Sequence, residues 1–234
     1  MKKVALKICG MNQNTSEVAM LQPDYLGFIF YDKSPRDFSG EIPSLPKHIK
    51  KVGVFVNASL EEISEKIKKY NLDVIQLHGE ESPTFCEKLR DAITTTVEVP
   101  VLSAVEEPVL SAVEVPVLSA VEVWKVFSIK DSFNFDLLTP FENKVDKFLF
   151  DTKGKEKGGN GYVFDWRILE NYPSKKPFIL SGGIGLNEIE KLKSILKSDL
   201  PIHAIDVNSK FESEPGLKNT DDLKQFMQEL QTED

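Results

Sequence analysis

The chain has 234 residues, 41% of them hydrophobic and 28% charged, a composition typical of a folded protein with an apolar core. The formal net charge of −8 works against sequence-independent binding to nucleic acid or to an anionic membrane, because both need a concentrated excess of Lys and Arg. The N-terminal residues lack the apolar run of a signal peptide or a spanning helix, so we expect a cytoplasmic protein with no membrane or nucleic-acid partner. Two cysteines without CxxC spacing and three scattered histidines predict reduced thiols and no metal site.

Short runs of β-branched and aromatic residues predict strands at regular intervals along the chain. They cover residues 4–9, 25–30, 51–56, 74–79, 123–129, 147–152, 178–183 and 204–209. Helix start signals or helical spacing occur at 59–70, 84–92, 164–172, 186–196 and 220–231. Strands that alternate with helices indicate a parallel sheet, and eight such units in roughly 200 to 250 residues predict a closed barrel. The predicted fold is therefore α/β, a single (β/α)8 TIM barrel over residues 1–234.

Two stretches interrupt this pattern. Pro43 and Pro46 break any helix in the second crossover, where we expect a loop or one short turn. Residues 97–120 repeat the unit VEVPVLSA three times almost unchanged, between the helix that precedes them and the predicted fifth strand. The repeat is too long for one barrel strand, and each unit carries a Pro and at least one Glu, which oppose strand pairing. We expect a loosely extended excursion or, alternatively, a small β-meander.

In a (β/α)8 barrel the reactive groups lie at the C-terminal ends of the strands and in the loops that follow. Polar and small residues gather at these positions of the sequence. The candidates are Lys7, Cys9, Arg36, His78, Asp151, Gly182, Gly183, Asp206, Ser209 and Lys210.

The motifs around these residues resemble those of the phosphoribosylanthranilate isomerase family of tryptophan biosynthesis. They are KICG, GFIFYDKSPR, VGVFVN, IQLHGEES, LFDT followed by GGNGYVFDW, LSGGI, and AIDVNSKFE followed by PGLKN. One motif alone is weak, but the ordered set is specific and covers essentially the whole chain except the repeat. Removing the 24 residues of the repeat leaves 210, a size that suits such a barrel. We therefore interpret residues 97–120 as an insertion within the barrel domain.

The resemblance implies an isomerase that acts by general acid–base catalysis, without cofactor or metal. Its reaction is the Amadori rearrangement of N-(5-phosphoribosyl)anthranilate to 1-(2-carboxyphenylamino)-1-deoxyribulose 5-phosphate. The resemblance assigns the acid, which protonates the ribose ring oxygen, to Asp151, and the base, which removes the C2 proton, to Cys9. A thiol that acts as a base should have a lowered pKa, and Lys7 on the same strand face could supply the positive charge. The alternative interpretation of Cys9 is a small buried strand residue.

The other candidates are expected to bind substrate. Arg36 resembles the family arginine that holds the anthranilate carboxylate, the alternative being a loop salt bridge to Asp32 or Asp37. Backbone N–H groups after the seventh and eighth strands suit the phosphate. The residues assigned to this cradle are Gly182, Gly183, Ser209 and Lys210, the last replacing a Gly of many family members.

Three further features have open interpretations. Asp206 resembles a family residue near the substrate's amino group, but a buried partner for Lys7 is an equal alternative. His78 either contacts substrate or only orients a loop. The glycines at 158–161 predict a mobile loop over the site.

Two other functions compete with the isomerase. The fold suits another sugar-phosphate isomerase or an indole-glycerol-phosphate synthase, although the synthase would need catalytic lysines and a glutamate at several strand ends, where only Lys7 occurs. Alternatively the barrel is a scaffold whose repeat pairs with a partner or a second copy, but the intact Cys9, Arg36 and Asp151 argue against this. We expect a small phosphorylated substrate as the partner and favour a monomer over a dimer.

Overall fold

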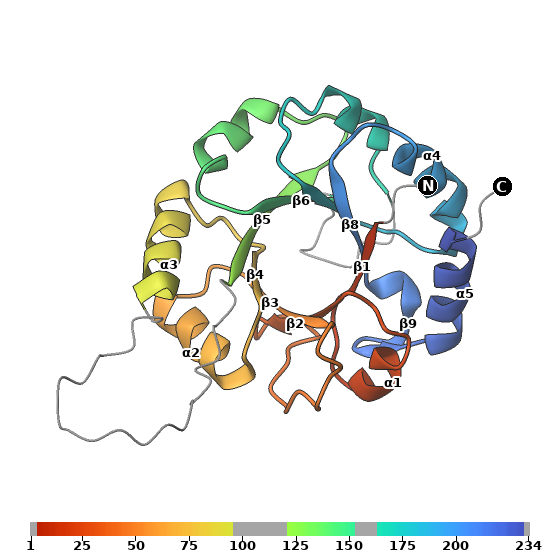
Figure 1. The fold of residues 1–234 in the computed structure, drawn as a ribbon, viewed down its shortest axis with the longest axis horizontal. Coiled ribbons are helices and arrows are strands. Elements are labelled where there is room, and N and C mark those ends of the chain that lie inside the picture. The colour runs from red at the N-terminus through yellow and green to blue at the C-terminus, as the bar shows by residue number, and fades with distance from the viewer. Residues whose placement is uncertain (1–3, 96–120, 153–162, 232–234) are drawn as a thin grey trace, which may run out of the picture.

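The structure is a computed structural model and describes residues 4–95, 121–152 and 163–231. Parallel strands follow one another in chain order round a closed barrel, and the last pairs with the first (Figure 1). The strands are β1 (Ala5–Ile8), β2 (Tyr25–Phe30), β3 (Lys50–Phe55), β4 (Val74–Leu77), β5 (Glu122–Ile129), β6 (Lys147–Thr152), β7 (Phe178–Leu180) and β8 (Ile202–Val207). The predicted (β/α)8 barrel is confirmed.

Helices surround this ring of strands. The α-helices are α1 (Thr15–Ala19), α2 (Leu60–Tyr70), α3 (Pro83–Thr95), α4 (Ile189–Leu196) and α5 (Thr220–Gln231). The 3-10 helices are η1 (Phe135–Phe141), η2 (Trp166–Asn171), η3 (Leu186–Glu188) and η4 (Ser209–Phe211). A small antiparallel hairpin of β9 (Glu212–Glu214) and β10 (Leu217–Lys218) follows the last barrel strand.

The predicted capping signals begin α2 and α3 as expected. Ser59 Oγ accepts the backbone N–H of Glu62, and Ser82 Oγ accepts that of Phe85, each at 3.1 Å. The expected helix at 164–172 is instead the short 3-10 helix η2. Its apolar side chains recur every three residues, a spacing that a 3-10 helix places on one face. The buried residues at this spacing are Trp166, Leu169 and Tyr172.

The second crossover, residues 31–49, contains no helix, as the prolines predicted. Aromatic side chains cover this part of the barrel instead. Phe38 packs edge-on against Phe28 and Tyr70, with ring centroids 4.9 and 5.8 Å apart, and Tyr70 stacks on Phe30. The Tyr70 hydroxyl donates to the carbonyl of Gly40 at 3.1 Å, which ties the loop to α2.

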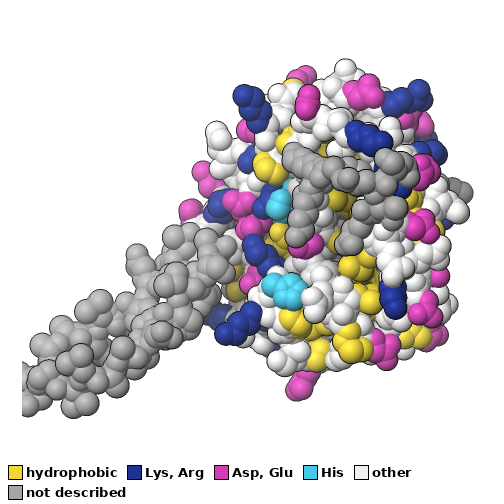
Figure 2. All heavy atoms as spheres, turned by 45° about the vertical axis from the view of Figure 1, so that its right-hand side comes forward, with side chains coloured by type: hydrophobic (Ala, Val, Ile, Leu, Met, Phe, Trp, Pro, Cys, Tyr) yellow, Lys and Arg dark blue, Asp and Glu magenta, His cyan; other side chains and the backbone are white. Residues whose placement is uncertain are grey.

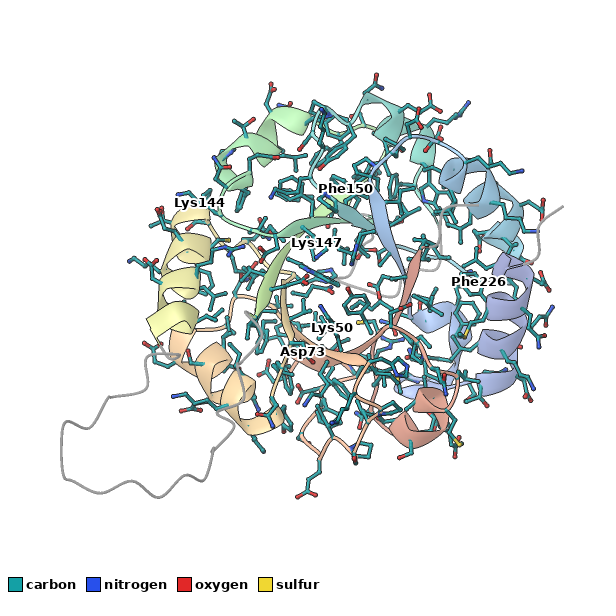
Figure 3. The ribbon with its side chains drawn as sticks, viewed as in Figure 1. Lys50, Asp73, Lys144, Lys147, Phe150 and Phe226 are labelled. Carbon is teal, nitrogen blue, oxygen red and sulfur yellow. The ribbon has the colours of Figure 1, made fainter. Side chains whose placement is uncertain are left out.

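The two-residue period of a strand sorts the side chains into an inner and an outer layer. Phe150 of β6 and Phe226 of α5 are fully buried in the outer layer, between barrel and helices (Figure 3). The inner layer fills the barrel with a second apolar cluster that includes Trp124 and Leu149. The same alternation turns the polar side chains near the C-terminal strand ends inward. They are Lys7, Gln76, Asp151 and Asp206.

The predicted insertion at 97–120 and the glycines at 158–161 lie outside the described residues. On either side of residues 97–120, α3 ends at Thr95 and β5 begins at Glu122. Within the described ranges, no helix is long and apolar enough to cross a membrane. The face in Figure 2 carries Lys and Arg side chains interspersed with Asp and Glu.

Candidate active site

A pocket opens at the C-terminal ends of the barrel strands, the end that carries catalytic groups in this fold. All of the predicted site residues except Lys7 and Arg36 line it. The loop and strand-end positions read from the sequence therefore converge on one place. Gln76 and Asn208, which the sequence interpretation did not single out, also line this pocket.

Lys7 and Asp206 form a buried ion pair at the pocket floor. Lys7 is fully buried, and its Nζ lies 2.7 Å from Asp206 Oδ1, while Ser181 Oγ donates to Asp206 Oδ2 at 3.1 Å. Burial opposes the charge on Lys7, but the neighbouring Asp206 and Cys9 outweigh it and raise the Lys7 pKa. Lys7 is thus a permanent cation whose charge Asp206 balances, which corresponds to the alternative interpretation of Asp206.

Cys9 follows β1, and its thiol lines the pocket although the residue is only 4% exposed. Burial raises the pKa of this thiol, Asp206 adds to the rise, and the positive charges of Lys7 and Lys218 oppose it only in part. Lys7 does act to lower this pKa, as expected, but the expectation that the thiol's pKa is lowered overall is wrong. The main physical reason is burial of the thiol, and the Asp206 carboxylate, 2.7 Å from the Lys7 ammonium, adds to the rise.

Gly27 of β2 makes room for this pair. A Cβ at Gly27 would lie 2.9 Å from Cys9 Sγ and 3.3 Å from Lys7 Cε, closer than side chains pack without displacement. The inner layer of the barrel therefore has space for the thiol and the lysine stem only because β2 has no side chain here. The glycine in the motif GFIF is explained by packing against the site.

Asp151 and His78 lie beside each other in the pocket. Asp151 Oδ1 accepts the backbone N–H of Thr152 at 2.8 Å, and its Oδ2 lies 3.3 Å from His78 Nε2. Gln76 Nε2 lies 3.2 Å from His78 Nδ1, so the histidine ring is held at both nitrogens. The Gln76 Oε1 atom is buried and has no hydrogen-bond partner among the described residues. His78 is thus placed beside the carboxyl group, and the chain Gln76–His78–Asp151 orients it.

Gly182 and Gly183 form the pocket wall after β7, both with positive φ, +93° and +69°. A Cβ at Gly182 would lie 2.3 Å from Thr152 Oγ1 and 2.8 Å from Asp151 Oδ1, so only glycine allows the loop to approach Asp151. The Lys210 stem packs over Gly185, since a Cβ at Gly185 would lie 3.1 Å from Lys210 Cβ. Ser209 and Lys210 line the same part of the pocket, with Gly185 preceding η3 and α4.

Arg36 does not line the pocket but lies in an ion pair beside it. Its Nε is 3.0 and 2.9 Å from the two carboxylate oxygens of Glu212, and its Nη2 is 2.6 Å from Oε2. The alternative expectation, a salt bridge from Arg36 to Asp32 or Asp37, is therefore wrong. Asp37 Oδ1 instead accepts the N–H of Tyr31 at 2.9 Å. Pairing is possible because the hairpin after β8 lies beside the loop after β2, next to β1.

Glu212 also accepts from Lys218, whose Nζ lies 2.7 Å from Glu212 Oε1 and 2.7 Å from Asn208 Oδ1. The Arg36 and Lys218 interactions outweigh the burial of Glu212 and lower its pKa, so the group stays ionised. Glu212 and Lys218 stand inside the quoted motifs KFE and PGLKN, but nothing in their spacing indicated that they contact Arg36. Long-range contacts of this kind become visible only in the folded chain.

Comparison with known proteins gives one consistent result. The model of the N-(5'phosphoribosyl)anthranilate (PRA) isomerase family matches residues 6–116 and 111–229. The N-(5'-phosphoribosyl)anthranilate isomerase of Parabacteroides distasonis is 38% identical over 234 residues, 96% of this chain and 92% of its own. The crystal structure of the Thermotoga maritima isomerase is similar with a TM-score of 0.73 and 28% identity, over 97% of this chain and 98% of that one.

A third relative is a phosphoribosyl anthranilate isomerase in complex with reduced 1-(o-carboxyphenylamino)-1-deoxyribulose 5-phosphate. It shares the fold, with a TM-score of 0.70 and 24% identity, over 97% of this chain and 98% of that one. By the family model and by the identity to a relative across its whole length, this chain belongs to the N-(5'-phosphoribosyl)anthranilate isomerase family.

Proposed function

We propose that Asp151 and Cys9 are the acid and the base of the reaction that family membership gives this chain. The chain is an isomerase that converts N-(5'-phosphoribosyl)anthranilate to 1-(2-carboxyphenylamino)-1-deoxyribulose 5-phosphate in tryptophan biosynthesis. One observation carries the assignment of residues: a carboxyl group, a thiol and a glycine-lined wall meet in a single pocket at the C-terminal strand ends.

Asp151 acts first in this proposal. Its Oδ1 already accepts the N–H of Thr152, so the transferable proton is assigned to Oδ2, which faces His78. The carboxyl group gives this proton to the ribose ring oxygen as the bond from C1 to that oxygen breaks. The lone pair of the anthranilate nitrogen forms the C1=N bond, and the product of the step is an open-chain protonated Schiff base.

Cys9 acts second, as the thiolate. It takes the proton from C2, the electrons of that bond form C1=C2, and the C1=N electrons return to nitrogen as the enolamine forms. The enolamine becomes the ketone when its hydroxyl loses a proton and C1 gains one. The enzyme is reset when the thiol releases its proton to water and the Asp151 carboxylate regains one.

The raised pKa of Cys9 favours the neutral thiol in the free enzyme. Ring opening creates a positive charge on the nitrogen of the Schiff base, next to the C2 proton that Cys9 removes. An opposite charge at this distance favours the thiolate. The base is therefore activated most strongly when the intermediate that needs it is present.

The two charged ends of the substrate are assigned to opposite sides of the pocket. Gly182, Gly183, Ser209 and Lys210 would hold the phosphate, through backbone N–H groups and one ammonium. Arg36 would hold the anthranilate carboxylate. His78 and Asp206 would contact the substrate between these ends, beside Asp151 and Cys9 respectively.

We further propose that residues 97–120 are an insertion into one barrel domain. The family model matches in two segments that overlap within the repeat, at residues 111–116, and this break in the match supports an insertion. The monomer remains our proposed state, and light scattering of the full chain would test it. A mass of two chains would contradict the monomer without affecting the assigned chemistry.

The activity is tested by generating phosphoribosylanthranilate in situ and following the loss of its fluorescence after the protein is added. We expect a rate proportional to protein concentration. A rate no faster than the spontaneous breakdown of the substrate would overturn the function. An equal rate from the Asp151→Asn protein would overturn the assignment of the acid to Asp151.

A further inference from the structure

Arg36 is held by a carboxylate that belongs to a different part of the chain. Arg36 lies in the loop after β2, whereas Glu212 begins the hairpin after β8. Three contacts of 2.6 to 3.0 Å join Arg36 Nε and Nη2 to the two oxygens of Glu212. The Arg36 and Glu212 side chains are only 13% and 4% exposed, so little water competes for these hydrogen bonds.

Among the residues that the structure describes, the guanidinium contacts Glu212 through one edge, and its other edge has no partner. Arginine has five N–H donors in a rigid plane, and Glu212 occupies the edge formed by Nε and Nη2. The edge formed by Nη1 and the second N–H of Nη2 has the spacing to bind another carboxylate with two hydrogen bonds. Glu212 therefore fixes the plane of Arg36 and the direction in which its free edge points.

A second contact fixes the stem of Arg36 close to the base. A Cβ at Gly10 would lie 2.9 Å from Arg36 Cδ and 2.5 Å from Asn208 Oδ1, and Gly10 has a φ of +71°. The residue before Gly10 is Cys9, which lines the pocket. The free edge of Arg36 is thus anchored next to the wall that carries the thiol.

Lys218 gives the cluster of Arg36, Glu212 and Lys218 a net positive charge. It is fully buried as a side chain, and its Nζ donates to Glu212 Oε1 and to Asn208 Oδ1, each at 2.7 Å. Arg36 and Glu212 alone would be neutral and would attract an anionic group only weakly. With Lys218 the three charges sum to +1, so the cluster attracts a substrate carboxylate while Arg36 stays fixed.

We propose that Glu212 is a positioning residue for substrate recognition, and that Lys218 preserves the positive charge which this positioning would otherwise cancel. The proposal rests on the role of Arg36 in binding the anthranilate carboxylate. Glu212 touches no substrate in this account. It acts by presenting the free edge of Arg36, in the way that outer partners orient the ligands of a metal.

The test measures binding of two probes by calorimetry. One is reduced 1-(o-carboxyphenylamino)-1-deoxyribulose 5-phosphate, and the other is the same compound without the carboxylate. In Glu212→Gln we expect the first probe to bind roughly 10- to 100-fold more weakly. The second should bind within about threefold of wild type, because no carboxylate contact is left to lose. Lys218→Met should also weaken binding of the first probe more than binding of the second.

Three controls make the result specific. Glu214→Gln removes an exposed carboxylate from the same hairpin and should change neither affinity. Arg36→Met combined with Glu212→Gln should bind the first probe no more weakly than Arg36→Met alone, because Glu212 acts through Arg36. If Glu212→Gln has a lowered melting temperature, Glu212→Asp serves as a second variant. It keeps the charge and should recover part of the preference for the probe that carries the carboxylate.

Equal weakening of both probes, or none, in a folded Glu212→Gln protein would overturn the proposal. Additive losses in the double variant would do the same. These results are distinct from a failure of the proposed function, which would appear as a wild-type protein that neither isomerises phosphoribosylanthranilate nor binds the first probe.

Discussion

The two ends of the barrel are built from the same strands but place their polar groups in opposite ways. At the N-terminal end, Tyr25, Trp124 and His203 pack edge-on in the barrel interior, with ring centroids 5.2 to 6.3 Å apart. Glu122 accepts from Trp124 Nε1 at 2.9 Å and pairs with Lys147 and Lys50, which lie toward the centre of the ring of strands (Figure 3). Each of these polar groups has its partner within the cluster.

At the C-terminal end the polar groups are only partly matched. Within the described part of the chain, Gln76 Oε1 is buried without a partner and one edge of Arg36 makes no contact, and the pKa of the Cys9 thiol is raised. Unmatched buried groups cost stability, so a chain retains them where a ligand completes them. We therefore expect the N-terminal end to contribute mainly to the stability of the barrel and the C-terminal end to contribute mainly to activity. Substitutions at the two ends should therefore separate activity from stability.

Replacement of the base should have the largest effect on activity. Cys9→Ser should lower kcat by about 10³ to 10⁴, because a hydroxyl is too weak an acid to supply the base that a thiolate provides. Its melting temperature should stay within a few degrees of wild type. Because burial raises the pKa of Cys9, wild-type activity should rise from pH 7 toward pH 9 as the thiolate fraction grows. Near-normal turnover in a folded Cys9→Ser protein would exclude Cys9 as the base.

Removal of the acid should lower kcat by a similar or smaller factor than removal of the base. Asp151→Asn should lower kcat by about 10² to 10⁴, since an amide cannot give a proton to the ring oxygen and regain it. The amide still accepts the N–H of Thr152 at Oδ1, so folding and binding of the reduced product should change little. Steady-state kinetics and calorimetry of that compound test both statements. An acid elsewhere in the site is the conclusion if turnover survives.

The sequence predicted the fold well because each strand is a local signal. The buried runs, the serine caps of α2 and α3, and the prolines that remove a helix at 31–49 act over a few residues and do not depend on distant contacts. The helix expected at 164–172 failed for the same kind of reason. Its buried residues fit the period of three that selects a 3-10 helix over an α-helix.

The sequence predicted which residues line the pocket, but it did not predict the direction of the Cys9 pKa shift. Strand ends and motifs brought Cys9, His78 and Asp151 to one pocket. The predicted direction of the Cys9 pKa shift was wrong because burial of the thiol, the main cause of the rise, and the nearby Asp206 both arise only after β8 closes the barrel against β1. Glu212 could not be assigned to Arg36 from sequence, because 176 residues separate them.

The N-terminal end should respond to substitution in the opposite way from the site. Trp124 is fully buried and contacts Tyr25 and His203, so Trp124→Ala should lower the free energy of unfolding by about 3 to 5 kcal/mol. Its kcat at low temperature should stay within about threefold of wild type. Urea unfolding and kinetics on the same sample give both numbers. A large loss of kcat in the folded protein would show that the two ends are coupled.

A smaller and pH-dependent effect is expected from His203 in the same cluster. Burial is the main cause that lowers its pKa to about 4, and Lys147 adds to the fall. The Nε2 atom of the ring lies 2.8 Å from the Tyr25 hydroxyl oxygen. Between pH 6.5 and 4, His203 is protonated in the unfolded chain but stays neutral in the folded chain. The free energy of unfolding therefore falls as the pH drops from 6.5 to 4.

Allowing for partial exposure, His203 should contribute about 1 to 3 kcal/mol to this fall in stability. His203→Gln keeps an acceptor for Tyr25 without the titration, so its unfolding free energy should fall less steeply over this range. His48 is exposed, and His48→Gln should follow the wild-type slope. Identical slopes in wild type and His203→Gln would mean that His203 titrates normally in the folded state.

The smallest effect is expected from deleting the repeat, which lies between α3 and β5 in the sequence. α3 ends at Thr95 and β5 begins at Glu122, so a change between them acts away from the strand ends that carry Cys9 and Asp151. The entropy of closing a loop grows only logarithmically with its length, so 24 additional residues should cost roughly 1 to 2 kcal/mol. Deleting residues 97–120 and joining Thr96 to Val121 should leave kcat and KM within about twofold and keep or slightly raise the melting temperature. A large loss of kcat in the folded deletion protein would show that the repeat supports the active end, and the separation of the two ends would then be wrong.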